Sequence, residues 1–215
     1  MWLKVDGELP SGGPLIAYLN HPSWWDGYAA MLLDRGLLRG AYTSFVMMDE
    51  AQLARYRFFR WCGAFSVDRR SPRSSLASVE YATRLLAGRP DRALWIFPQG
   101  ELQPDDRAPI ALYPGAARIA LGAAATMLPA AVRLEFGRAQ RPEMFLRVGP
   151  AHPVVGTTPA AVTADLTARL ARAVEELRED VRRGDRQGYA VLLRGRAGID
   201  RRWDALRGHR SATGS

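Results

Sequence analysis

Cysteine is nearly absent from this sequence. Cys62 is the single cysteine among 215 residues, which excludes an internal disulfide and a metal site built from several cysteines. A lone thiol with no local partner beyond nearby arginines predicts a buried, inert side chain, and the composition fits a reducing compartment. Lysine is equally scarce: Lys4 is the single lysine, so arginine carries almost all of the positive charge.

Long apolar runs are also missing. The longest charge-free stretch in the apolar interior lies between Arg118 and Arg133 and is interrupted by Pro129. It falls short of the roughly 20 residues needed to cross a bilayer. Residues 1–14 include charged side chains and end in a turn, unlike a signal peptide. These absences predict a soluble or peripheral protein.

The formal charge of +8 and the pI near 10.3 indicate an anionic partner. Nucleic acid and the anionic surface of a membrane both fit such a charge, and charge alone does not choose between them. The arginines are spread along the chain, with clusters at 69–73, 182–183 and 194–210. No zinc-knuckle spacing or aromatic RNA-binding motif accompanies these clusters in the sequence.

Short apolar runs alternate with longer helical patterns. Strands are predicted at 15–19, 42–48, 64–67, 93–97, 127–134 and 144–148, and helices at 28–38, 51–61, 74–87 and 115–125. The alternation predicts an α/β fold: a single domain with a largely parallel mixed sheet flanked by helices. Nearly continuous apolar strands favour this fold because they require cover on both faces of the sheet.

The last third of the sequence has a different pattern. Thr158 and Pro159 are typical of a helix cap followed by proline in the first turn, and apolar residues then recur at helical spacing up to Val181. We expect one domain over residues 1–215, with a core at about 14–156 and a helical C-terminal extension at about 157–210. The basic segment after Gly184 is expected either to lie on a lipid surface or to dock as a terminal helix.

The run from Asn20 to Asp26, with the sequence NHPSWWD, directly follows the predicted strand at 15–19. It places an imidazole and a carboxylate five positions apart at the end of a buried strand. His21 is there a candidate general base and Asp26 the group that orients its ring, which indicates proton removal from a hydroxyl. The structural alternative is that Asp26 begins a helix and His21 is an ordinary core or loop histidine.

Three further stretches end or interrupt predicted strands. They are residues 63–69 (GAFSVDR), 97–101 (FPQGE) and 128–132 (LPAAV). Strand ends of one α/β sheet meet at its carboxyl edge, where ligands usually bind, so we expect these stretches to gather near His21 and Asp26. The backbone around Gly100 is a candidate to approach a developing oxyanion, because glycine permits close backbone access.

Together these stretches resemble the motif blocks of the glycerolipid acyltransferase family, whose best-known members acylate glycerol-3-phosphate and lysophosphatidate. The first block of that family is a histidine, four residues and an aspartate, as at His21 and Asp26. The stretch from Gly63 to Arg69 is similar to the second block, and residues 97–102 are similar to the third, usually FPEGTR. Leu128 and the proline after it resemble the fourth, so the resemblance covers roughly residues 15–155.

The resemblance implies an O-acyltransferase that moves a fatty acyl group from an acyl thioester to a hydroxyl of a lipid acceptor, lysophospholipid-like or glycerolipid-like. His21 would take the hydroxyl proton and Asp26 would hold the imidazole tautomer, with no acyl-enzyme. Ser23 is expected to cap the helix that contains Asp26 rather than to act as a nucleophile. Acyl-CoA or acyl-ACP would serve as co-substrate, and no resident cofactor or metal is expected.

Acceptor binding is assigned by the same resemblance to Arg69, Gln99, Gly100 and Glu101. Two residues depart from the third block, since Gln99 stands in place of its glutamate and Leu102 in place of its arginine. Leucine cannot replace a guanidinium that binds phosphate in a bidentate manner. The acceptor's head group is therefore left open among a phosphate held by Arg69, a sugar and another alcohol.

The expected partners are an acyl thioester donor, a lipid hydroxyl acceptor and an anionic membrane surface, with acyl carrier protein as a further candidate and no nucleic acid. The expected location is the cytoplasm, peripheral on the inner face of the membrane. Because family members often carry an apolar anchor before the first block, either the protein is peripheral or a further segment precedes Met1. The alternative functions are thioester or ester hydrolysis by the same pair, acylation of a glycosylated lipid, and a non-catalytic basic module that binds membrane or nucleic acid.

Aromatic and sulfur-containing side chains are frequent between residues 24 and 61. They are candidates to line an acyl channel, with ordinary core packing as the alternative for each. They comprise Trp24, Trp25, Phe45, Met47, Met48, Phe58, Phe59 and Trp61. The arginines from Arg55 to Arg73 are expected to form a solvated face or to contact donor phosphates or a membrane.

Overall fold

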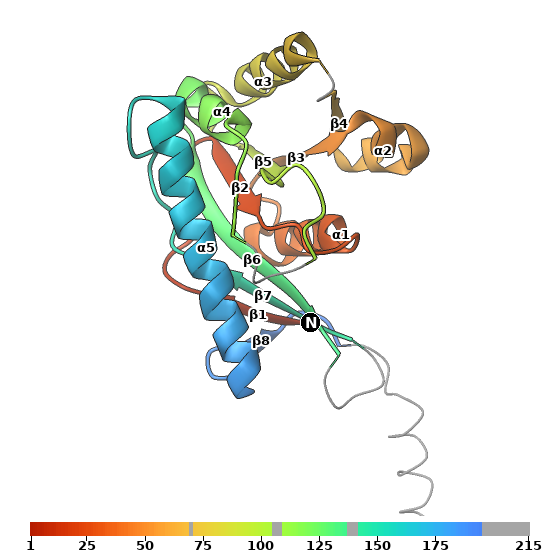
Figure 1. The fold of residues 1–215 in the computed structure, drawn as a ribbon, viewed down its shortest axis with the longest axis vertical. Helices are drawn as coiled ribbons and strands as arrows, with labels where there is room; N and C mark the ends of the chain where they lie inside the picture. Colours follow the sequence, from red (N-terminus) through yellow and green to blue (C-terminus); the bar gives the residue numbers. More distant parts are fainter. Residues whose placement is uncertain (69–70, 105–108, 137–141, 195–215) are drawn as a thin grey trace, which may run out of the picture.

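A single sheet runs through the whole molecule. Its strands are β1 (Trp2–Val5), β2 (Leu15–Leu19), β3 (Thr43–Asp49), β4 (Ala64–Val67), β5 (Arg92–Ile96), β6 (Thr126–Glu135), β7 (Glu143–Val148) and β8 (Ala190–Val191). The computed structural model describes residues 1–68, 71–104, 109–136 and 142–194, and in it the strand order is β4-β3-β5-β2-β6-β7-β1-β8 (Figure 1). The five strands from β4 to β6 are parallel, β7 is antiparallel to β6, β1 is parallel to β7, and β8 is antiparallel to β1.

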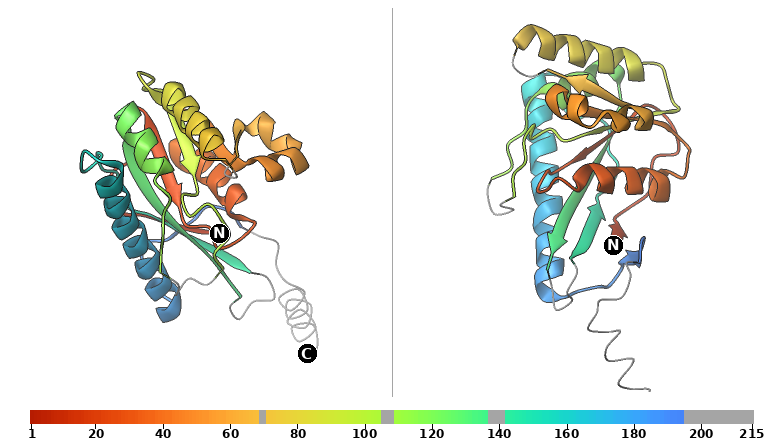
Figure 2. Two further views of the ribbon diagram at one scale, coloured as in Figure 1. Left: turned by 45° about the horizontal axis from the view of Figure 1, so that its top comes forward. Right: turned by 90° about the vertical axis from the view of Figure 1, so that its right-hand side faces the viewer.

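Helices cover both faces of the sheet, as Figure 2 shows from two further sides. One face is covered by α3 (Pro72–Leu86), α4 (Gly115–Ala123) and α5 (Pro159–Arg183). The other is covered by α1 (Asp26–Leu33) and its π-helical continuation η1 (Asp34–Leu38). Beside β3 and β4 stand α2 (Glu50–Arg55) and the 3-10 helix η2 (Arg57–Cys62). No helix among the described residues combines the length and the apolar character that crossing a bilayer requires.

The central strand β2 explains the apolar pattern of the sequence. All of its residues are completely buried. Ile16 and Tyr18 belong to the core beneath α3, α4 and α5, whereas Ala17 and Leu19 belong to the core beneath α1. Successive side chains of a strand point to opposite faces, so a strand covered on both faces needs an apolar side chain at every position.

The predicted fold class is confirmed, and the six predicted strands agree with the observed ones within one residue at each end. The helix predicted at 51–61 is instead two short helices, because Tyr56 between them has a non-helical φ of −115° and ψ of 62°. The helix predicted at 28–38 changes from α to π geometry at Asp34. The sequence pattern therefore predicts the bounds of the strands more accurately than the bounds and the type of these two helices.

β1 and β8 have no counterpart among the predicted strands. β1 is short and contains Lys4, so it lacks an apolar run, and its partner β7 lies far away in the chain. Ion pairs fasten it in place: the Asp180 carboxylate accepts from Lys4 Nζ at 3.2 Å and from Arg147 Nη1 at 2.7 Å. Arg147 Nε also donates to Asp6 at 2.6 Å, so one cluster joins β1, β7 and the end of α5.

The predicted helical C-terminal extension contains α5, which packs on the sheet as one of its covering helices. The Thr158 hydroxyl oxygen accepts the N–H of Ala161 at 3.2 Å and Pro159 opens the first turn, as predicted. The apolar face of the helix contributes Leu166 and Leu170 to the core shared with α3 and α4. In the segment after Gly184, residues 190–191 join the sheet as β8, and residues 195–215 lie outside the described part of the chain.

The second histidine of the described residues is buried between β2 and the segment after β7. His152 Nδ1 donates to the Pro153 carbonyl at 2.8 Å, which leaves Nε2 to accept the Tyr18 hydroxyl at 3.0 Å. Burial is the largest cause that lowers the pKa of His152. A neutral imidazole here joins two parts of the core, which is a structural role.

We predict that Gly63→Ala lowers the free energy of unfolding by about 2 kcal/mol or more, measured by urea unfolding. Gly63 has a φ of +79°, and a Cβ there would lie 2.5 Å from the Ser44 carbonyl oxygen. The left-handed conformation alone costs an L residue roughly 1–2 kcal/mol. Gly27→Ala is the matched control, because a Cβ at Gly27 in α1 meets nothing within 4 Å and alanine favours the helix. Equal stability of Gly63→Ala and the wild type would contradict the prediction.

Candidate active site

Asn20 fixes the point at which the chain leaves the sheet. Its side-chain Oδ1 accepts the Val132 N–H at 2.8 Å, and its Nδ2 donates to the Val132 carbonyl at 3.0 Å. The side-chain amide thus makes the two hydrogen bonds that a backbone N–H and carbonyl would make. It extends the contact of β2 with β6 by one residue. Because Asn20 is buried and both of its polar atoms are used, the residue that follows it starts from a rigid position.

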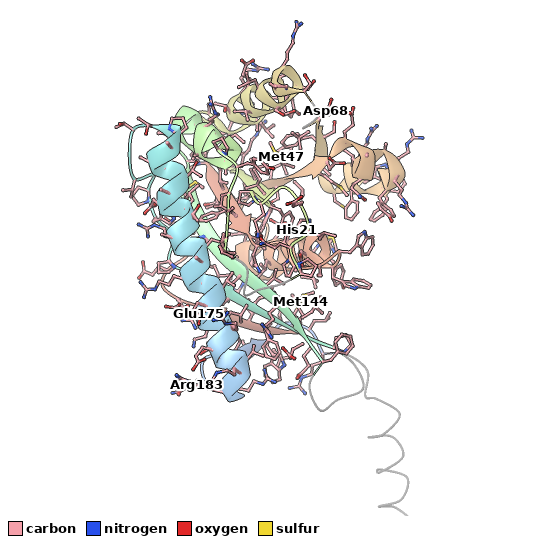
Figure 3. The ribbon with its side chains drawn as sticks, in the orientation of Figure 1. His21, Met47, Asp68, Met144, Glu175 and Arg183 are labelled. Atoms are coloured by element: carbon pink, nitrogen blue, oxygen red, sulfur yellow. The ribbon has the colours of Figure 1, made fainter. Side chains whose placement is uncertain are left out.

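His21 and Asp26 form a hydrogen-bonded pair, which we call the dyad. His21 Nδ1 lies 2.9 Å from Asp26 Oδ2, the carboxylate is fully buried, and the imidazole is 24% exposed. His21 is labelled in Figure 3. An ionised carboxylate only accepts hydrogen bonds, so Nδ1 carries the proton and Nε2 presents its lone pair. The geometry therefore leaves Nε2 as the ring nitrogen that can accept a proton from a substrate.

Ser23 completes the environment of the Asp26 carboxylate. Its backbone N–H donates to Oδ2 at 2.8 Å, and its hydroxyl donates to Oδ1 at 2.7 Å. The expected helix cap is absent, because α1 begins at Asp26 with no side-chain cap and the Ser23 hydroxyl oxygen instead accepts the N–H of Trp25 at 3.2 Å. The residue therefore holds the carboxylate rather than the helix end.

The turn after β5 holds His21 from the other side. The ring of Phe97 stacks on the imidazole, with centroids 4.4 Å apart. Gln99 Oε1 accepts the His21 N–H at 2.8 Å, and the Gln103 N–H donates to the His21 carbonyl at 2.8 Å. The Gln99 amide nitrogen donates to the side-chain oxygen of Gln103. Both backbone groups of His21 are therefore bound by one turn, and the expected meeting of this turn with the dyad is observed.

The structure places the predicted acceptor residues unevenly. Gln99 is buried and both ends of its amide are bound within the protein, which is the arrangement of a positioning side chain. Gly100 has a φ of +75°, and its N–H donates to the Phe97 carbonyl at 3.0 Å, so that N–H closes the turn and does not point toward an oxyanion. Glu101 is exposed beside the turn, and Arg69 lies outside the described residues. Acceptor binding by these four residues stays a prediction.

Several of the aromatic candidates for an acyl channel are exposed to solvent. Trp24, Trp25, Phe58 and Trp61 are at least half exposed. Among the other candidates, Phe45 and Met47 pack against the core beneath α3, α4 and α5. The prediction of a buried thiol is wrong, because Cys62 is exposed at the end of η2.

Two further observations concern other places where a ligand or a metal could bind. A shallow pocket of about 330 Å³ lies between β4 and α3, lined by Phe65, Ser66, Ala77, Ser78 and Tyr81. Within the described ranges, no group of three or more histidine, cysteine, aspartate or glutamate side chains is arranged to hold a metal ion.

A family model described as Acyltransferase matches residues 3–133, more than half of the chain. The chain belongs to the acyltransferase family. The resemblance to glycerolipid acyltransferases drawn from the motif blocks is thereby confirmed, and the matched range contains the dyad and the turn that holds it.

This acyltransferase chain is also 30% identical to a 1-acyl-sn-glycerol-3-phosphate acyltransferase of Streptococcus pneumoniae (strain ATCC BAA-255 / R6) over 118 residues. These residues are 53% of the present chain and 39% of the streptococcal protein. The chain therefore spans well under half of the length of that relative.

Two positioning residues of this acyltransferase were not assigned from the sequence. Asn20 was visible only as a neighbour of the first motif block, and the side-chain pairing with Val132 depends on the distant strand β6. No local pattern marks Gln103, because it acts through its backbone N–H and through a contact with Gln99. The signal in the sequence that points to Asn20 is its place as a polar residue directly after a buried strand.

We predict that Gln99→Leu speeds the exchange of the His21 backbone N–H with solvent deuterium by roughly 10- to 100-fold, measured by NMR. Loss of the acceptor leaves a partly buried donor unpaired, which costs about 1–3 kcal/mol locally. Gln99→Glu is the matched control, because a carboxylate oxygen keeps the acceptor at the same position. Unchanged protection in Gln99→Leu would show that the side chain does not hold residue 21.

Proposed function

We propose that this protein moves a fatty acyl group from an acyl thioester to a hydroxyl of a lipid acceptor resembling a lysophospholipid or another glycerolipid. The single observation that carries the proposal is the His21–Asp26 hydrogen bond of 2.9 Å at the end of the central strand. Membership in the acyltransferase family and the name of the streptococcal relative support the reaction class. Acyl-CoA or acyl-ACP is the proposed donor, and the cytoplasmic face of the membrane is the proposed location.

The dyad performs the transfer by general base catalysis. His21 Nε2 removes the proton of the acceptor hydroxyl while that oxygen attacks the thioester carbonyl carbon. The negative charge of the Asp26 carboxylate stabilises the imidazolium through the hydrogen bond to Nδ1. The tetrahedral intermediate then expels the thiolate, which takes the proton from Nε2. An ester and a free thiol are formed, and His21 returns to its neutral state.

The hydrogen bonds of Ser23 support direct transfer without an acyl-enzyme. Its hydroxyl donates to Asp26 Oδ1 at 2.7 Å. A serine nucleophile would instead give its proton to a histidine nitrogen, as activation by an adjacent base requires. The hydroxyl of the acceptor is therefore the proposed nucleophile.

The third motif block bears on the head group of the acceptor. Leu102 is 49% exposed next to the turn, and its side chain offers no donor to a phosphate. The resemblance assigns two arginines to phosphate binding, of which Arg69 is present and the one in the third block is replaced by Leu102. We therefore propose an acceptor whose reactive hydroxyl is recognised without a phosphomonoester, such as a lysophospholipid with a larger head group, with a glycosylated lipid as the second candidate.

We predict that the protein forms an ester product from a labelled acyl thioester and a lysophospholipid, identified by mass spectrometry. The acceptor panel includes lysophosphatidate, glycerol-3-phosphate and a glycolipid, and reactions without an acceptor measure hydrolysis. The lysophospholipid is expected to be preferred over glycerol-3-phosphate, because leucine replaces the phosphate-binding arginine of the third block. Thioester hydrolysis that no acceptor diverts would favour the hydrolase alternative, in which water takes the place of the alcohol.

We predict that His21→Ala and Asp26→Asn each lower the rate of acyl transfer by a factor on the order of 10²–10⁴ while the protein stays folded. The first variant removes the base, and the second removes the charge that fixes the Nδ1–H tautomer. Circular dichroism checks the fold. His152→Asn is the matched control, because its amide can still donate to the Pro153 carbonyl and the residue lies outside the site. Turnover near the wild-type rate by folded His21→Ala would end the base assignment.

A further inference from the structure

An exposed aromatic and basic surface extends from the dyad loop onto η2. Its residues are Trp24, Trp25, Arg57, Phe58, Arg60 and Trp61, which we call the arginine–tryptophan face. Each of the four aromatic residues is at least 50% exposed, and Trp61 reaches 92%. Both arginines are exposed on the same short helix. This amount of exposed aromatic surface indicates that the face is an interaction site.

The two halves of the arginine–tryptophan face are joined by ring contacts. The ring of Trp24 packs edge to face on Tyr56 with centroids 5.6 Å apart, and Trp25 packs on Trp24 at 5.4 Å. Tyr56 immediately precedes η2, so the dyad loop and η2 present one continuous surface. The right-hand view of Figure 2 looks onto the side of the molecule that carries α1 and α2, with α5 across the sheet from them.

The charge of this surface is of one sign. Residues 51–67 contain no aspartate or glutamate. Among the ion pairs of the described ranges, none includes Arg57 or Arg60, whereas Arg172 and Arg182 on α5 are paired with glutamates of their own helix. The guanidinium groups of the face are therefore available for external phosphates, which guanidinium binds in a bidentate manner.

The combination of rings and arginines fits a bilayer better than an acidic protein. Tryptophan prefers the boundary between lipid head groups and acyl chains, and arginine binds phosphates at that level while its stem stays in apolar surroundings. An acidic protein would match Arg57 and Arg60, but it would offer charge rather than apolar depth to Phe58 and Trp61. An anionic bilayer satisfies both kinds of side chain at one depth.

We propose that the arginine–tryptophan face docks this protein on an anionic lipid bilayer, with Phe58 and Trp61 inserted at the head-group boundary. The inference deepens the proposed function and rests on it in one respect, namely that the acceptor is a bilayer lipid. Trp24 and Trp25 lie between His21 and Asp26 in the sequence. Docking through these rings therefore brings the dyad against the surface that holds its acceptor.

Vesicle sedimentation of the full chain tests the docking. Phe58→Ala/Trp61→Ala and Arg57→Gln/Arg60→Gln are each expected to weaken binding to vesicles of phosphatidylglycerol and phosphatidylcholine at least about 10-fold. The wild type is expected to bind pure phosphatidylcholine more weakly and to lose affinity with salt. Arg172→Gln/Arg182→Gln removes the same charge from α5 and is the matched control, expected to bind like the wild type.

Cys62 offers a second readout at the same place. It is exposed and is the single cysteine of the chain, so an environment-sensitive dye attached to it lies at the end of η2. Its emission is expected to shift to the blue when anionic vesicles are added. The control is the same dye on Cys62→Ser/Glu175→Cys, since Glu175 is 58% exposed on α5 (Figure 3) and is expected to stay in water.

The outcomes separate docking from catalysis. Unchanged vesicle affinity in both face variants, or a Cys62 dye that stays in water, would overturn the inference. Binding of the wild type to acyl carrier protein through the face, without binding to vesicles, would also overturn it. His21→Ala is expected to bind vesicles like the wild type, which supports a face that acts independently of the base. Face-dependent vesicle binding without any acyl transfer would refute the proposed function and leave the docking in place.

Discussion

The buried carboxylate of Asp26 is the constraint on which the rest of the site depends. A charged group that is withdrawn from water is stable only where hydrogen bonds replace its solvation. Ser23 supplies two of these bonds and His21 supplies the third. The loop therefore has to curl back on itself, and this curl turns the imidazole so that one nitrogen is bound inside and the other is left for chemistry. The tautomer, the ring orientation and the path of the loop are consequences of one desolvated charge.

The sheet supplies position where the loop supplies orientation. Asn20 binds both backbone groups of Val132, and the turn after β5 binds both backbone groups of His21. β2 lies between β5 and β6. The position of His21 is therefore fixed by contacts to both flanking strands, through its own backbone on the β5 side and through Asn20 on the β6 side. The residues that make these contacts, Asn20, Gln99 and Gln103, all have neutral amide side chains. The one formal charge of the assembly is thereby kept on the carboxylate that pairs with the imidazole.

The sequence predicted what depends on local pattern and failed where distant residues decide. The strand at Leu15–Leu19 was found to the residue because complete burial leaves only apolar side chains. β1 was missed because its place in the sheet depends on β7 and on an ion-pair cluster around Asp180. The proximity of His21 and Asp26 followed from their spacing, but the hold of Ser23 on the carboxylate did not. Burial of Cys62 was inferred from residue type, and the short helix η2 instead places it in solvent.

The crossover from β3 to β4 is an excursion of the chain between two paired strands. Both strands are fixed by parallel pairing from Val46 with Ala64 to Asp49 with Val67, and the chain between them leaves the sheet and returns to it. Gly63 closes this excursion with a backbone shape that suits almost no other residue. Between those fixed ends most side chains are exposed, apart from the buried Leu53, so their composition can change without altering the strand pairing. Substitutions of these exposed residues can therefore change what the protein contacts without moving the paired strands.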